Sequence, residues 1–144
     1  MSTEENKALA RRMVDAWNQG DLDALDELIA PDYVFHDPAD PTTASGPAGA
    51  KQMVSAFRTA FPDLRLTIAD EIAEGDKVVQ RLTATGTHRG PLLGIPATGK
   101  QVTMSSIEVM RIERGKIAEH WDEFDMLGVL QQLGAIPTPG QPDQ

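Results

Sequence analysis

The sequence contains no cysteine among its 144 residues. A chain without thiols cannot form disulfides, supply a thiolate nucleophile or build a cysteine-ligated zinc or iron–sulfur site. It also lacks any run of about 18 apolar residues, so no transmembrane helix is expected. The N-terminal stretch MSTEENKALARR has no apolar segment of the kind found in signal peptides, and we therefore expect a cytoplasmic protein.

Positive charge is scarce as well. The chain has 13 Lys and Arg against 22 Asp and Glu, a formal net charge of −9, and its basic residues are scattered. A nucleic-acid-binding protein needs a cationic surface that displaces counterions. The charge balance therefore argues against nucleic acid, anionic membranes and polyanionic substrates, and leaves neutral or hydrophobic small molecules as candidate partners.

The first part of the chain has the periodicity of helices. A capping box at Ser2 and Glu5 begins one, and Leu9, Met13 and Trp17 recur every four positions along its apolar face. A second short helix follows an Asp cap, and a third follows a loop that is rich in proline and glycine. The expected segments are helices over 2–19, 21–30 and 47–60, a strand over 32–37 and a loop over 38–49.

In the second part the period changes to about two, which is typical of strands. The expected segments are strands over 64–75, 77–90, 101–115 and 116–124, a loop over 91–100, a helical turn or two over 125–134 and a frayed tail over 135–144. Helices followed by antiparallel strands indicate an α+β fold. We expect one domain over 1–134, in which three helices on the concave side of a curved antiparallel sheet form a cone with a cavity.

The turn between the last two strands decides which side chains share a face. A two-residue loop at Arg114-Gly115 would place Arg114 at a positive φ, which a non-glycine residue adopts at a cost. A three-residue loop over 113–115 places the left-handed residue at Gly115, where it costs nothing sterically. The turn chemistry therefore predicts the three-residue loop.

That loop pairs Glu108 with His120 and Ser106 with Asp122. Glu108, His120 and Asp122 then lie on one face of the hairpin, together with Ser106 and Met110, because directly opposed residues share a face. The two-residue loop would instead send Glu108 and Asp122 to opposite faces.

The face shared by these residues could be the concave one or an exposed one. Two carboxylates in an apolar cavity cannot both ionise easily, so one is expected to keep its proton to higher pH. Such a group can move a proton at carbon or at a carbonyl oxygen near neutral pH. Alternatively, Glu108 and Asp122 are ordinary exposed charges, and the residue spacing leaves both readings open.

Four stretches carry a resemblance to a known family: WNQGDLDALDELIAPDYVFHDP, FRTAFPDL, AEGDKVVQRLTATGTHRGPLLGIPATGK and VMRIERGKIAEHWDEFDMLGVLQQLG. In their order and spacing they resemble the SnoaL-like polyketide cyclases (ester cyclases) of the NTF2-like superfamily. The resemblance extends to about Gly134 and implies the NTF2-like cone, a curved sheet with three helices enclosing a cavity.

The resemblance also implies a reaction. Asp122, in HWD, matches the aspartate that acts as general acid and base in an intramolecular aldol ring closure of a polyketide methyl ester. The family uses neither a metal nor an organic cofactor. His88, in GTHRG, resembles a family histidine, whereas Glu108 stands where the characterised cyclases carry a histidine.

The three histidines each allow two interpretations. His36 could point into the cavity mouth or cap backbone at the end of its strand, and His88 could line the pocket or be a core histidine. His120 could orient Asp122 or lie at an interface. The candidate catalytic residues are Asp122, Glu108 and His120, and no metal site is expected because the three histidines lack close ligand spacing. The candidate substrate-binding residues are His36, His88, Trp17, Met53, Phe57, Met104 and Met110.

Three functions therefore remain open from the sequence. The first is a cofactor-independent cyclase or isomerase that works by proton transfer at Asp122. The second is a ketosteroid-isomerase-like or hydrolytic enzyme on the same fold, and the third is a non-catalytic protein that binds a small ligand. We also expect a homodimer or higher homo-oligomer, since the convex face of the sheet would carry apolar residues such as Ile107 and Val109.

Overall fold

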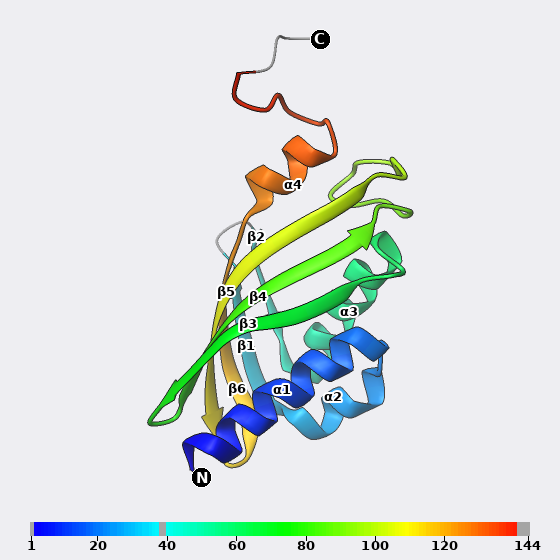
Figure 1. Cartoon of the computed structure of the whole chain (residues 1–144). Helices are drawn as coiled ribbons and strands as arrows, with labels where there is room; N and C mark the ends of the chain where they lie inside the picture. Colours follow the sequence, from blue (N-terminus) through cyan, green and yellow to red (C-terminus); the bar gives the residue numbers. More distant parts are fainter. Residues whose placement is uncertain (1, 38–39, 141–144) are drawn as a thin grey trace.

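The computed structural model describes residues 2–37 and 40–140, with the first three helices gathered on one side of a six-stranded sheet and the last helix at its end (Figure 1). The elements in chain order are α1 (Thr3–Gln19), α2 (Leu22–Leu28), β1 (Ile29–Asp37), β2 (Asp40–Ser45), α3 (Gly46–Ala60), β3 (Arg65–Glu74), β4 (Lys77–Thr87), β5 (Gln101–Glu113), β6 (Lys116–Phe124) and α4 (Met126–Gln132). The expected α+β architecture is confirmed.

The helices begin where their caps predict. Ser2 accepts a hydrogen bond from the backbone N–H of Glu5, and the Glu5 carboxylate accepts one from Ser2 N–H, which completes the capping box. Asp21 caps α2 by accepting from the N–H of Ala24 at 3.2 Å. Gly20 ends α1 in the left-handed conformation, and the chain turns directly into α2.

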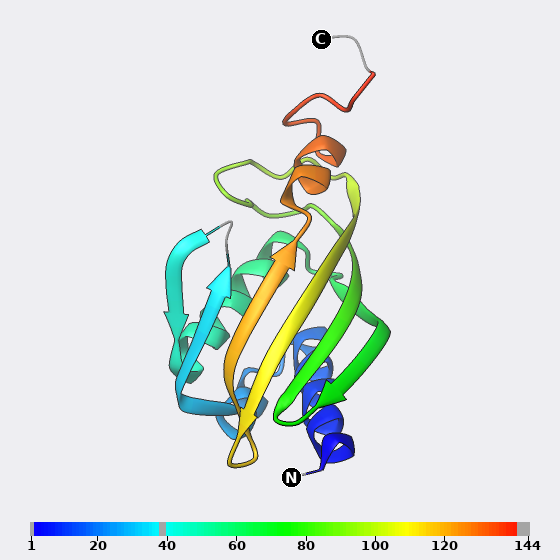
Figure 2. The same cartoon turned by 90° about the vertical axis from the view of Figure 1, so that its left-hand side faces the viewer.

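The strand order in the sheet is β2-β1-β6-β5-β4-β3, and the sheet curves around α1, α2 and α3 on its concave side (Figure 2). The expectation of a purely antiparallel sheet is wrong at one position, because β1 and β6 pair in parallel. Most of the chain lies between these two strands, so a long connection brings them side by side. The last helix, α4, follows β6 and packs against β5.

The segment 38–49, expected to be a loop, contains the edge strand β2 in its described part. β2 pairs antiparallel with β1, with Val34 opposite Ser45 and Phe35 opposite Ala44. Proline at position 41 fits this location, because an edge strand can leave one side of its backbone unpaired. Composition alone missed the strand for that reason.

Strand β1 also begins three residues earlier than expected, at Ile29 rather than Asp32. Its pairing with β6 shifts register between Ile29 and Val34, a stretch that includes Pro31. Proline lacks the N–H that a regular ladder needs, which accounts for the irregularity.

Two apolar clusters lie between helices and sheet. One is centred on residues such as Leu25, Ile117 and Met110, and the other on Phe61 and Val129; Trp17 packs against both.

Among the described helices, none is long and apolar enough to span a bilayer. Of the predicted tail, residues 135–140 follow α4 without regular secondary structure, and the rest lies outside the described residues.

Candidate active site

A cavity of about 540 Å³ opens between the concave face of the sheet, α1, α3 and the loop after β4. Its walls are mainly apolar and draw on both core clusters. Five of the predicted substrate-binding residues contribute to these walls: Trp17, Met53, Phe57, Met104 and Met110. An apolar hollow with a few polar groups at one wall is the usual form of a small-molecule site.

The turn that sets this wall differs from the prediction. The β5–β6 loop has two residues, Arg114 and Gly115, with φ values of 52° and 75°. Both are left-handed, as in a type I′ turn, whose twist matches that of the flanking strands. The predicted three-residue loop is therefore wrong: the favourable twist of the hairpin outweighs the steric cost of a positive φ at Arg114.

A second irregularity restores the predicted face. Between Arg111 and Ile112 the register of β5 against β6 shifts, because Arg111 pairs with Glu119 while Ile112 pairs with Ile117. The extra residue on β6 is Ala118, which acts as a β-bulge. Beyond the bulge, Glu108 lies opposite Asp122. The same residues thus share a face as predicted, although their partners differ.

That face is the concave one. Glu108, His120 and Asp122 all line the cavity, so the reading in which they are ordinary exposed charges is excluded. His120 is 4% exposed, and its Nε2 lies 3.5 Å from Glu108 Oε1. That separation is long for a hydrogen bond, but it places a carboxylate directly beside this nitrogen of the ring.

Tyr33 completes this group and was not identified as a site residue from the sequence. Its hydroxyl lies 3.1 Å from Nδ1 of His120, and the residue is 1% exposed. Burial, followed by the negative charges of Glu108 and Asp122, raises the pKa of Tyr33, so the hydroxyl keeps its proton and can act as a hydrogen-bond donor.

The tautomer of His120 follows from both neighbours of its ring: Glu108 beside Nε2 is an acceptor and favours a proton there, which leaves Nδ1 to accept from the Tyr33 hydroxyl. When Nδ1 accepts from Tyr33, the proton of the neutral imidazole resides on Nε2, the nitrogen beside Glu108. The ring of Phe35 packs edge-on against His120, with centroids 5.0 Å apart, and limits its rotation. The sequence offered one signal: Tyr33 and Phe35 alternate along the same strand and therefore share a face.

His36 occupies the opposite face, so the expectation that it points into the cavity mouth is wrong. Because Tyr33 and Phe35 take the concave side of β1, His36 must project from the convex side. There its Nε2 lies 2.8 Å from Glu119 Oε2, and its ring stacks on Trp121 at 5.4 Å. The hydrogen bond from His36 is the main cause that lowers the pKa of Glu119.

His88 is fully buried but does not line the cavity, which corrects its place among the predicted substrate-binding residues. Its Nδ1 accepts from the backbone N–H of Thr98 at 3.2 Å and lies 3.0 Å from Thr98 Oγ1. Its backbone N–H donates to Lys100 O. His88 therefore holds together the base of the loop 88–100, which is the core-histidine reading.

Comparison with known proteins agrees with this architecture. The family model for SnoaL-like polyketide cyclases matches residues 7–133. The chain belongs to this family. It is 36% identical to the aklanonic acid methyl ester cyclase DnrD of Streptomyces peucetius, over 96% of this chain and 97% of that protein.

Two further family relatives extend the comparison. The nogalonic acid methyl ester cyclase of Streptomyces nogalater is 36% identical over 85% of this chain and 92% of its own. The solved structure of TsrD from Streptomyces laurentii superposes with a TM-score of 0.85 at 37% identity, covering 94% of this chain and 99% of that one. Fold and sequence thus match these relatives over nearly their whole lengths.

Proposed function

We propose that this SnoaL-like protein closes a ring in a polyketide ester by an intramolecular aldol reaction, with Asp122 as the acid and base and without a cofactor. The observation that carries the proposal is the row of Glu108, His120 and Asp122 at one wall of an apolar cavity. The similarity to two methyl ester cyclases supports a polyketide ester as substrate.

The reaction needs one proton removed and one returned. The Asp122 carboxylate takes a proton from a carbon between two carbonyl groups, and the enolate carbon then attacks a ketone carbon of the same molecule. A carbon–carbon bond forms, and the resulting alkoxide takes up the proton from the Asp122 carboxyl to become a hydroxyl group. One residue can serve both steps, because the proton that leaves carbon is the one that reaches oxygen.

His120 stabilises the charge that develops in this scheme. With Nδ1 occupied by Tyr33, its Nε2–H is available as a donor to the enolate oxygen. Glu108 lies beside that nitrogen, with Oε1 at 3.5 Å, and its carboxylate favours the ring proton on Nε2 rather than on Nδ1. In this chain Glu108 would therefore hold the donor of His120 on Nε2, at the position where the resemblance implies a histidine in the characterised cyclases.

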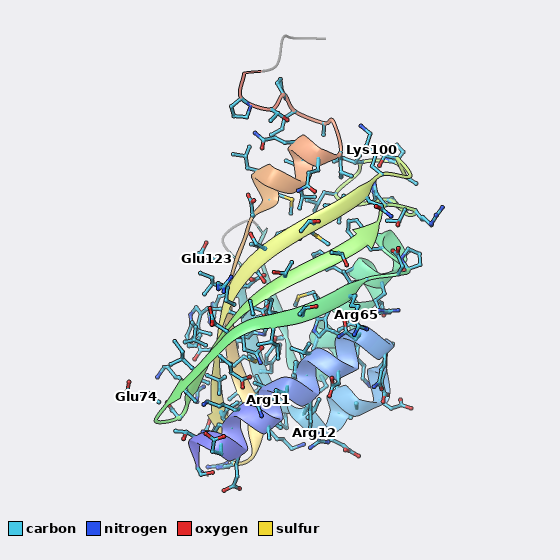
Figure 3. The ribbon with its side chains drawn as sticks, viewed as in Figure 1. Arg11, Arg12, Arg65, Glu74, Lys100 and Glu123 are labelled. Atoms are coloured by element: carbon cyan, nitrogen blue, oxygen red, sulfur yellow. The ribbon has the colours of Figure 1, made fainter. Side chains whose placement is uncertain are left out.

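A spectrophotometric cyclisation assay with an anthraquinone-type polyketide methyl ester tests the proposal. In Asp122→Asn the amide cannot act as a base, so kcat should fall by about 10² to 10⁴. The matched control is Glu123→Gln, since Glu123 is exposed and points away from the helices (Figure 3). Full turnover in Asp122→Asn would contradict the role of Asp122.

A different pair of results would favour another function. If the wild type binds such esters tightly but turns none over, and Asp122→Asn binds equally well, the protein is a ligand-binding member of the family rather than a cyclase. Turnover of a steroid-type enone or hydrolysis of the ester, lost in Asp122→Asn, would keep the role of Asp122 and change the reaction.

We propose further that the protein is a cytoplasmic homodimer that assembles through the convex face of its sheet. Four apolar residues lie directly opposite one another across that face: Ile72, Val79, Val109 and Trp121. Ile107 in the next row is 51% exposed. A second copy would cover this apolar band, and a two-fold axis would let the same surface serve both partners.

A further inference from the structure

Gln80 is a buried polar residue in the cavity wall, and the proposed reaction assigns it no role. It is 0% exposed and lies on β4, directly opposite Glu71 of β3 on one side and Glu108 of β5 on the other. Glu108 in turn lies opposite Asp122. A single row of polar side chains therefore crosses four strands and ends at the proposed acid and base.

The orientation of the Gln80 amide follows from its partner on β3. Its Nε2 donates to Glu71 Oε2 at 2.8 Å, and Glu71 Oε1 lies 2.7 Å from Nη2 of Arg11 on α1 (Arg11 is labelled in Figure 3). A carboxylate paired with arginine can only accept hydrogen bonds, so the amide must present its NH₂ group to it. Arg11 and Glu71 thus fix which end of the amide faces β3.

The carbonyl oxygen is the other end of this amide, in a side chain that lines the cavity. In a planar amide the oxygen and nitrogen diverge from the same carbon, so Oε1 is directed away from Glu71. This atom is buried and has no hydrogen-bond partner among the residues that the structure describes. Its neighbour across the strands, Glu108, also presents acceptors when ionised, so that pairing supplies no donor.

A buried acceptor at the wall of a ligand cavity requires a donor, and the ligand can supply it. We propose that Oε1 of Gln80 accepts a hydrogen bond from a hydroxyl group on a ring of the bound molecule. The substrate would therefore be hydroxylated on the edge that docks against β4, in a cavity whose other walls are apolar. This inference rests on the proposed function for the identity of the ligand as substrate, but it is tested by binding alone.

The test compares 2-hydroxyanthraquinone with 2-methoxyanthraquinone, which keeps an oxygen at the same position but cannot donate. Wild type should bind the hydroxyl compound about tenfold more tightly, the preference expected for one hydrogen bond. In Gln80→Leu this preference should fall to within about twofold. Thr83→Val is the matched control, because Thr83 lies on the same strand but is not among the residues that line the cavity; there the preference should persist.

A second variant keeps the test decisive if Gln80→Leu does not fold. In Glu71→Gln the new amide can donate to Gln80 and turn its carbonyl towards β3, so the hydroxyl preference should again fall. Glu74→Gln, an exposed change at the far end of β3 (Figure 3), should leave it intact.

Equal affinity of wild type for both compounds, no binding of either, or an unchanged preference in both variants that lack the free carbonyl would overturn the inference. These results are independent of turnover. A hydroxyl preference in a protein without cyclase activity would refute the proposed reaction alone. Cyclase activity that depends on Asp122, without any hydroxyl preference, would refute the role of Gln80 alone.

Discussion

At the scale of single residues, the hydroxyl of Tyr33 makes the most specific contact in the site. In Tyr33→Phe the ring stays in place but Nδ1 of His120 loses its donor, so the imidazole is free to carry its proton on either nitrogen. We expect kcat to fall about tenfold, the value of one neutral hydrogen bond, with KM little changed. Nitrogen NMR of the His120 ring should show a single tautomer in the wild type and a mixture in the variant.

A matched change separates this role from packing. Phe35→Leu alters the contact with the face of His120 but leaves the hydroxyl of Tyr33 in place, so the tautomer should not change. The same tautomer in wild type and Tyr33→Phe would contradict the assignment, whatever happens to the rate.

The sequence predicted part of this residue-level arrangement for a partly incorrect reason. The turn has one residue fewer than predicted, and the bulge at Ala118 adds one residue to β6. The two differences cancel, so Glu108, His120 and Asp122 still lie on one face of the hairpin. The prediction that His36 points into the cavity was wrong, because no local signal in the sequence tells which face of β1 is concave. That choice depends on where α1 and α3 pack, which is a tertiary effect.

At the scale of elements, Asp63 ties the segment after α3 to the end of β4. Its carboxylate accepts from both the backbone N–H and the hydroxyl of Thr87, each at 2.7 Å. These two hydrogen bonds lower the pKa of Asp63, the backbone one most strongly. A carboxyl with a depressed folded-state pKa stabilises the fold above its unfolded value of about 3.9, and this contribution is lost as pH falls through the lower folded-state value.

We therefore expect Asp63→Asn to be less stable than wild type at pH 7, with the difference shrinking towards about pH 2 to 3. Urea unfolding at both pH values measures it. Glu123→Gln, at an exposed position of β6, should lose stability with falling pH as the wild type does. A difference between wild type and Asp63→Asn that stays constant with pH would contradict the assignment.

Elements that begin at a local hydrogen bond, such as a helix cap, were predictable from the sequence. Elements that depend on a distant strand for pairing were not. The capping box at Ser2 and the cap at Asp21 are local hydrogen bonds, so α1 and α2 begin where the sequence says. β2 forms only because β1 provides a partner for its backbone, and its proline-containing stretch has the composition of a loop. The parallel pairing of β1 with β6 likewise depends on the whole path of the chain between them.

At the scale of the whole molecule, the convex face of the sheet carries an apolar row that the described part of the chain covers only in part. Its apolar row is flanked by charged pairs: Arg81 with Asp70 on one side, and Arg111 with Glu119 on the other. An apolar centre with a polar rim is the usual anatomy of a protein interface. The net charge of −9 opposes association of two copies, so the proposed interface should strengthen with added salt.

Ile107→Lys tests this interface directly. It places a charge on the exposed apolar residue beside the central row, and we expect it to convert a dimer into a monomer, because moving a hydrated ammonium into an interface is costly. Leu127→Lys adds the same charge at another exposed apolar position, on α4, and should remain dimeric. Sedimentation equilibrium from about 1 to 100 μM distinguishes the states over the affinity range of ordinary interfaces. A wild-type protein that stays monomeric at the highest concentration would leave the apolar row without the partner proposed for it and would refute assembly through this face.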